Sequence, residues 1–178
     1  MKADARNSIA LMIAIPTTHE GQGALDKINP KLSACLGKAA EGTNLYGTVT
    51  LKLTAASLRG AIAGALYQLQ FLRQSSNAWR IPAIVAPIIP LERVTESNQQ
   101  LVASYDFVQC LTKARPADVR NLVLSSIGSS EEDAAMSLLG PFMAPCVTRG
   151  TTIKTDRNTL RLLLAESLYR WSITAAST

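Results

Sequence analysis

The sequence has little of the chemistry from which most active sites are built. It contains one histidine, His19, and no Gly-x-Ser-x-Gly nucleophile motif. A Cys-His or Ser-His mechanism would have to use this histidine, which stands beside Glu20 in a glycine-containing segment. We therefore expect a protein that is not an enzyme and has no catalytic residue. A small enzyme built around His19 and Glu20 is the less favoured alternative.

Signatures of metals and cofactors are also missing. One histidine without clustered carboxylates supplies too few ligands for a metal site. The acidic residues 131–133 are better explained as the charged start of a helix. There is no P-loop, and Gly21 and Gly23 lack the third glycine of a dinucleotide fingerprint. We expect no metal, no cofactor and no small-molecule substrate.

The cysteines are few and far apart. Cys35, Cys110 and Cys146 are odd in number and form no Cys-x-x-Cys pair, which predicts buried thiols in a reducing compartment. No apolar run reaches the length of a membrane span, and no signal peptide is apparent. We expect a cytoplasmic protein, or a virion protein if it is a coat protein, with no membrane partner.

Charge is sparse as well. Only 17% of the 178 residues are charged, and the formal net charge is +5. The length fits a single domain over residues 1–178, with a mobile polar tail from about residue 172. So little charge is expected either where neighbouring subunits cover the surface or where a compact domain has a neutral exterior. The mildly basic balance is compatible with binding of a polyanion.

Strand patterns occur only near the N-terminus. Residues 8–18 are apolar and rich in isoleucine, which favours a buried strand, although a short helix is also compatible. Residues 46–54 alternate apolar and polar side chains with a period of two, as a half-buried strand does. Residues 81–91 are spaced by prolines and therefore extended. They form either an arm that reaches a neighbouring subunit or a connector within the domain.

Helical patterns dominate the second half. We expect a helix over residues 97–112, another that begins at Pro116, and a last one over residues 156–171. Between them, Ser129 and Glu132 form a capping box for a helix that should stop at Gly140. The predicted fold is therefore α+β and helix-rich, with two or three N-terminal strands and a helical C-terminal half.

The most informative helix is expected over residues 53–73. Leucines and one isoleucine recur at steps of three and four and predict a face packed on the core. A second face is almost bare of side chains, and two glycines inside a helix indicate a close-packing reason. We expect Ala56, Gly60 and Gly64 to form a subunit contact or a close helix contact.

Arginines on helix faces are the remaining functional signal. Arg59 and Arg73 on one helix, with Arg157 and Arg161 on another, are predicted to contact the phosphates of a nucleic acid. Aromatic residues that could stack on unpaired bases are Tyr46, Tyr67, Trp79 and Tyr105.

Two fragments resemble a known family. Residues 15–23 (Ile-Pro-Thr-Thr-His-Glu-Gly-Gln-Gly) and residues 57–61 (Ser-Leu-Arg-Gly-Ala) are similar to motifs of the RAMP superfamily, the RRM-like subunits that form the RNA-binding backbone of CRISPR effector complexes. This resemblance implies a ferredoxin-like core, repeated subunits along a guide RNA, and Arg59 near the RNA.

Together these patterns predict a non-enzymatic structural subunit that assembles with copies of itself. It would form a repeating nucleoprotein particle or filament on RNA or single-stranded DNA, as a viral or phage coat protein or as a CRISPR-like backbone subunit. The alternative is an interaction module or adaptor that binds protein only, with its arginines on a solvated surface.

Overall fold

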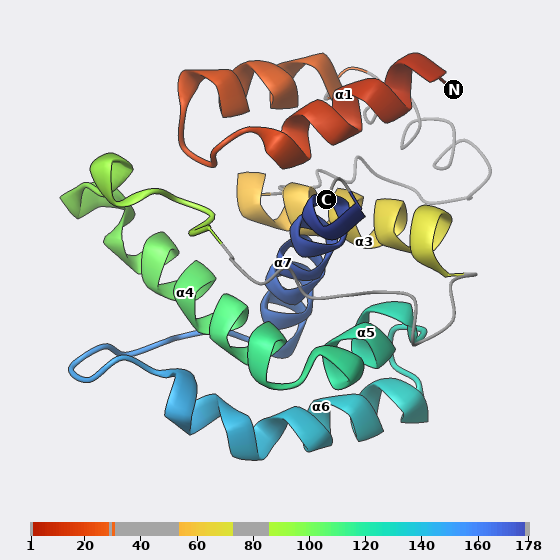
Figure 1. The fold of residues 1–178 in the computed structure, drawn as a ribbon, viewed down its shortest axis with the longest axis vertical. Coiled ribbons are helices and arrows are strands. Elements are labelled where there is room, and N and C mark those ends of the chain that lie inside the picture. Colours follow the sequence, from red (N-terminus) through yellow and green to blue (C-terminus); the bar gives the residue numbers. More distant parts are fainter. Residues whose placement is uncertain (1, 29, 31–53, 73–85, 177–178) are drawn as a thin grey trace, which may run out of the picture. The chain divides into compact units, whose positions relative to one another are not determined.

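The computed structural model describes residues 2–28, 30, 54–72 and 86–176. Contacts divide the chain into two compact units, residues 1–55 and residues 56–178. The single domain stays a prediction. The first unit contains α1 (Lys2–Ile13), followed by helical residues 19–28. Both helices are drawn at the red end of the colour scale in Figure 1.

The first predicted strand is wrong. Residues 8–13 belong to α1, and Leu11 and Met12 are fully buried. The turn after α1 is closed by the Thr18 hydroxyl, which donates to the Ile15 carbonyl and accepts from the Gly21 amide. A Cβ on Gly21 would lie 2.6 Å from the Ile15 carbonyl oxygen, so this turn requires glycine. A short apolar run does not distinguish a buried helix from a buried strand, which explains the error.

No strand is present in the residues that the structure describes, so the predicted α+β class is wrong and the fold there is all-helical. The second predicted strand, residues 46–54, lies outside the described residues except for Thr54. Part of the proline-spaced segment is described. Residues 86–90 lie on α4, where the Gln109 side chain donates to the Ala86 carbonyl at 3.0 Å and accepts from the Ile88 amide at 3.3 Å. This part is therefore attached within its own unit.

The second unit is a bundle of helices with short 3-10 turns. Its elements are α3 (Ala55–Phe71), η1 (Leu91–Arg93), η2 (Glu96–Asn98), α4 (Gln99–Ala114), α5 (Pro116–Leu124), α6 (Ser130–Met143), η3 (Ala144–Cys146) and α7 (Arg157–Ala176). Helix α7 packs on both α4 and α5, and α5 packs on α6 (Figure 1). Fully buried aliphatic side chains on these helices are Val108, Leu111, Val119, Leu122, Leu139 and Leu164.

Several helix ends follow from local chemistry. Pro116 occupies the first turn of α5, and the Ser129 hydroxyl caps α6 by accepting from the Glu132 amide at 3.2 Å. Helix α6 does not stop at Gly140, because this glycine lacks the positive φ of a left-handed cap, and the helix continues through Pro141. Helix α7 also continues to Ala176, where the sequence predicts a polar tail.

The prediction of reduced thiols is wrong for two of the three cysteines. Cys110 in α4 and Cys146 in η3 form a disulfide, with their Cα atoms 5.6 Å apart. They are 36 positions apart in the sequence and meet only because η3 packs on α4. That proximity belongs to the tertiary fold, so cysteine spacing could not show it. Cys35 lies outside the described residues.

Candidate functional site

Helix α3 buries only part of the predicted apolar face. Leu58 and Leu66 are buried, but Leu69, also expected on the core side, is 83% exposed. The small-residue face lies against α7. A Cβ added at Gly60 would be 2.5 Å from both the Cβ and the carbonyl oxygen of Leu162. At Gly64 it would be 3.6 Å from the Ala165 Cβ, an ordinary contact. The close approach at Gly60 is therefore made to a helix of the same chain, and Ala56 is half-buried at the start of α3.

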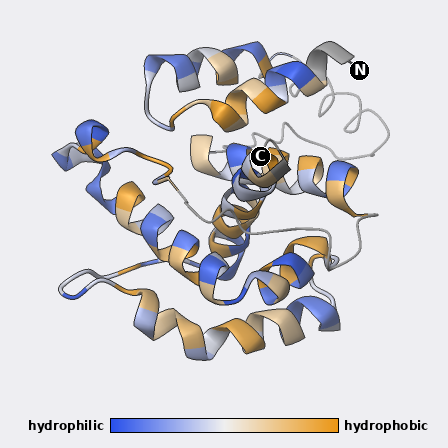
Figure 2. Ribbon diagram, in the orientation of Figure 1, coloured by the Kyte–Doolittle hydropathy of each residue, from blue (hydrophilic) through white to orange (hydrophobic). Residues whose placement is uncertain are grey.

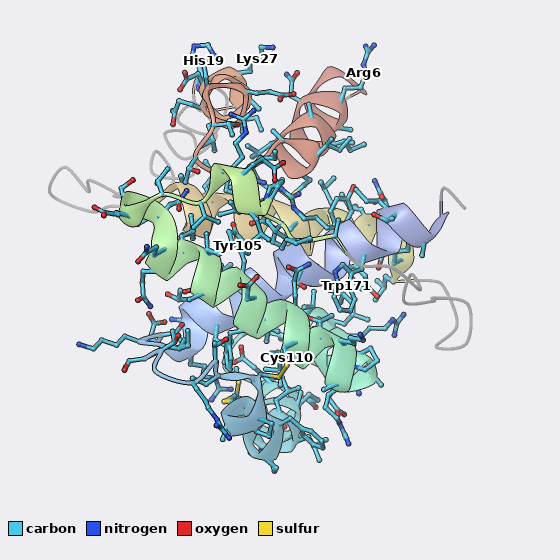
Figure 3. All side chains as sticks on the ribbon, turned by 60° about the vertical axis from the view of Figure 1, so that its left-hand side comes forward. Arg6, His19, Lys27, Tyr105, Cys110 and Trp171 are labelled. Carbon is cyan, nitrogen blue, oxygen red and sulfur yellow. A yellow bond between two sulfur atoms is a disulfide. The ribbon has the colours of Figure 1, made fainter. Side chains whose placement is uncertain are left out.

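Arg59 is drawn into the bundle beside Gly60. Its side chain is 2% exposed, and its Nε and Nη2 atoms donate to Oε1 of Glu166 in α7 at 3.0 and 2.8 Å. Tyr105 of α4 donates its hydroxyl to the other carboxylate oxygen at 2.9 Å, and Arg170 donates to Oε1 at 3.2 Å. We call these four residues the Glu166 cluster. Tyr105, labelled in Figure 3, reaches it from α4.

The charges and hydrogen bonds of the Glu166 cluster hold α3, α4 and α7 together. Burial, with the Glu166 charge as a second cause, raises the pKa of Tyr105 far above its ordinary value, so the phenol stays protonated as a donor. Burial also lowers the pKa of Arg170 from its ordinary value. A fully buried carboxylate is tolerated because each of its oxygens accepts hydrogen bonds. The Arg59 guanidinium is therefore bound to Glu166 inside the bundle and does not lie at the surface.

Arg161 and Arg157 meet at a second carboxylate, Glu132 near the start of α6. Arg161 donates to Glu132 Oε1 at 2.8 Å and to the Ser125 carbonyl at 2.7 Å. Arg157 donates to Glu132 Oε2 at 3.0 Å and pairs with Asp133. We call Glu132, Asp133, Arg157 and Arg161 the Glu132 cluster. It links α6 to the first two turns of α7.

The Glu132 cluster holds its carboxylate ionised. The hydrogen bond from the Gly128 amide, at 2.8 Å, is the largest cause that lowers the pKa of Glu132 below its ordinary value, and Arg161 and Arg157 lower it further. The hydrogen bond to Asp133 is the main cause that raises the pKa of Arg157. Arg161 is buried, whereas the Arg157 side chain is 42% exposed. Arg157 is therefore far more exposed to solvent than Arg161.

The structure separates the predicted nucleic-acid contacts. Arg59 belongs to the Glu166 cluster, Arg157 and Arg161 to the Glu132 cluster, and Arg73 lies outside the described residues. Tyr67 and Tyr105 are buried, so their rings are covered by protein. The other two predicted stacking residues, Tyr46 and Trp79, are outside the described residues. No common surface is formed by the three described arginines.

The first unit carries the single histidine. His19 is exposed and begins the helix at residues 19–28, next to exposed Glu20 (Figure 3). The first RAMP-like motif, residues 15–23, covers the turn before this helix and the first residues of the helix. The second motif, residues 57–61, lies in the first part of α3. The resemblance stays a prediction.

One surface feature was missed by the sequence analysis. Helix α6 buries Ala135 and Leu139 but also presents Ala134, Leu138 and Pro141 to solvent, and Leu138 is 51% exposed. We call these last three residues the α6 outer face. No charged residue occurs from position 134 to position 148, and that run of residues is the signal that could have revealed this face.

After η3, residues 147–156, called the connector here, lead to α7. Arg149 and Lys154 are exposed on it, and Gly150 adopts φ 79° in a turn closed by the Thr151 amide and the Thr148 carbonyl. Figure 2 shows hydrophilic colouring at its projecting end.

Within the described ranges, no group of three or more His, Cys, Asp or Glu side chains could hold a metal ion. No helix in the described part of the chain is long and apolar enough to cross a membrane. Comparison with protein-family models, with curated proteins and with solved structures found no match.

Proposed function

We propose that this chain is a non-enzymatic, self-associating helical protein whose α6 outer face binds a second copy of the chain. The observation that carries the proposal is that α6 is apolar on two sides. Ala135 and Leu139 pack inside the bundle, while Ala134, Leu138 and Pro141 recur at steps of four and three on the exposed side. A helix that is apolar around most of its circumference is typically covered by protein on both sides.

Charge complementarity favours a second copy as the occupant. Glu131 is exposed in the first turn of α6, and Arg149 is exposed on the connector beyond its other end. A two-fold axis places the same patch on both sides of an interface. Antiparallel pairing of two α6 helices would therefore bring the acidic end of one copy toward the basic connector of the other.

Size-exclusion chromatography with light scattering, over a series of protein concentrations, tests this proposal. We expect the wild-type mass to rise toward a multiple of the monomer, and Leu138→Lys to keep the monomer mass at every concentration. Leu91→Lys is the matched control, because Leu91 is 82% exposed on η1 of the same unit, away from α6. A wild-type protein that stays monomeric, or a Leu138→Lys variant that associates as wild type does, would refute the proposal.

A nucleoprotein assembly is the second candidate function. It is favoured by the net charge of +5 and by exposed cations in the second unit: Arg93, Lys113, Arg149 and Lys154. In this case the same particles would contain nucleic acid, giving an absorbance ratio at 260 and 280 nm that falls after nuclease treatment. Binding would also weaken steeply with salt, because the release of condensed counterions gains less free energy in a more concentrated salt solution. Particles that contain no nucleic acid and are insensitive to nuclease would refute the nucleoprotein assembly and favour a module that binds protein only.

A further inference from the structure

The disulfide between Cys110 and Cys146 lies at the surface of the bundle. Cys110 is an exposed residue of α4, and Cys146 ends η3 in a half-buried position. Figure 3 shows the yellow sulfur atoms at Cys110, where α4 meets the segment that follows α6. A dithiol in solution attacks a disulfide sulfur directly, so access to the bond is the first requirement for reduction of the folded protein.

Between the disulfide and Asp156, which caps α7 by accepting from the Thr159 amide, few contacts hold the connector. All of residues 147–156 are exposed or half-buried, so no fully buried side chain holds the segment. The Gln100 side chain donates to the Thr152 carbonyl at 3.3 Å, an exposed hydrogen bond that ties the connector to α4. The turn between Thr148 and Thr151 is internal to the connector. Segments with few buried contacts and exposed hydrogen bonds open at low free-energy cost.

The bundle itself has other attachments. The Glu132 cluster joins the start of α6 to α7, and Leu139 is fully buried in the second half of α6. The Glu166 cluster joins α3, α4 and α7 without any part of the connector. Breaking the disulfide therefore removes the covalent cross-link between η3 and α4 but leaves these contacts in place.

We propose that the Cys110–Cys146 disulfide is a redox-sensitive clasp, which holds the connector on α4 when closed and releases it when reduced by a dithiol. One thiolate of the dithiol attacks a sulfur of the pair, and the other sulfur leaves as a thiolate and takes up a proton. The second thiol of the dithiol then displaces the first cysteine. The clasp gains two electrons and two protons, and the dithiol becomes a disulfide. This proposal goes beyond self-association and does not depend on it.

Native-state reduction tests whether the clasp opens in the folded protein. The full-length Cys35→Ser chain is treated with dithiothreitol without denaturant, labelled with N-ethylmaleimide and weighed by mass spectrometry, while circular dichroism follows its helices. We expect label on both Cys110 and Cys146 with the helical signal retained. Label that appears only in denaturant, or loss of the helical signal together with reduction, would overturn the proposal.

Local release is measured in the same samples. Hydrogen exchange over residues 144–156 should accelerate on reduction, and trypsin should cut after Arg149 and Lys154 about tenfold faster or more, because cleavage follows the population of the open segment. Cys110→Ser combined with Cys146→Ser should show the fast rates without dithiothreitol, and reductant should not change them further. Cys35→Ser in its oxidised form is the control and should behave as oxidised wild type. Equal exchange and cleavage rates in the oxidised and reduced states would refute release of the connector.

Discussion

The close contact of α3 with α7 can be tested by two alanine substitutions one turn apart. Gly60 and Gly64 are both interior positions of α3, so each change to alanine gains about the same helix propensity, roughly 1 kcal/mol. At Gly64 the new methyl group would meet only the Ala165 Cβ at 3.6 Å. Gly64→Ala should therefore stabilise the protein or leave its free energy of unfolding unchanged.

At Gly60 the new methyl group has no room. It would lie 2.5 Å from the Leu162 Cβ and 2.5 Å from the Leu162 carbonyl oxygen, so backbone as well as side chain must move. Overpacking of this kind costs about 1–3 kcal/mol. Because the propensity gain is shared, subtracting the two free energies of unfolding isolates the packing cost. Gly60→Ala should be about 1–3 kcal/mol less stable than Gly64→Ala.

Urea unfolding followed by tryptophan fluorescence gives the comparison directly. The chain has two tryptophans, so a Trp79→Phe background leaves Trp171, which is buried in α7, as the reporter. With a slope of about 1–3 kcal/mol per molar urea, the midpoints should differ by on the order of 1 M. Equal midpoints for the two variants, or a higher midpoint for Gly60→Ala, would refute the close approach.

Three further perturbations address the buried carboxylates. Glu166→Gln leaves Arg59 and Arg170 without their common carboxylate and should cost about 3–5 kcal/mol in urea unfolding; a cost below about 1 kcal/mol would contradict the buried ion pair. Tyr105→Phe removes one hydrogen bond to the Glu166 carboxylate and should cost about 1.5–3 kcal/mol, with most of that cost absent in the Glu166→Gln background, whereas additive costs would exclude the coupling. Folding lowers the pKa of Glu132, so its contribution to the free energy of unfolding is present above its ordinary pKa of 4.5. That contribution is lost as the pH falls through the pKa of the folded state. Thermal melts should therefore show Glu132→Gln less stable than wild type at pH 7, with the gap narrowing toward pH 3; a constant gap would contradict that linkage.

Helices of the second unit were predictable where local chemistry specifies them. The first-turn proline of α5 and the Ser129 cap of α6 are both visible in the sequence. The helical state of residues 8–13 in α1 was not predictable, because this apolar run suits either a buried helix or a buried strand. The tertiary surroundings of this segment, and not its own sequence pattern, decide whether it forms a helix or a strand.

The tertiary structure was needed to show whether each predicted arginine is exposed or buried. An arginine on an apolar helix has the same sequence appearance whether it faces solvent or a buried carboxylate. Arg59 and Glu166 are separated by 107 positions, and Arg161 and Glu132 by 29, so neither pair has a local signature. The close-packing signal at Gly60 was visible, but only the structure shows that its partner is α7.

The order of helices along the chain has a consequence for how the second unit is made. Helix α7 carries buried residues that contact α3, α4, α5 and α6, yet it follows all of them in the sequence. During synthesis the four earlier helices therefore emerge from the ribosome before the surface that covers them exists. Until α7 is synthesised, their apolar sides are exposed to water or bound by a chaperone, because a domain buries its core only when its elements are all available. A ribosome that pauses before α7 would leave a nascent chain prone to aggregation.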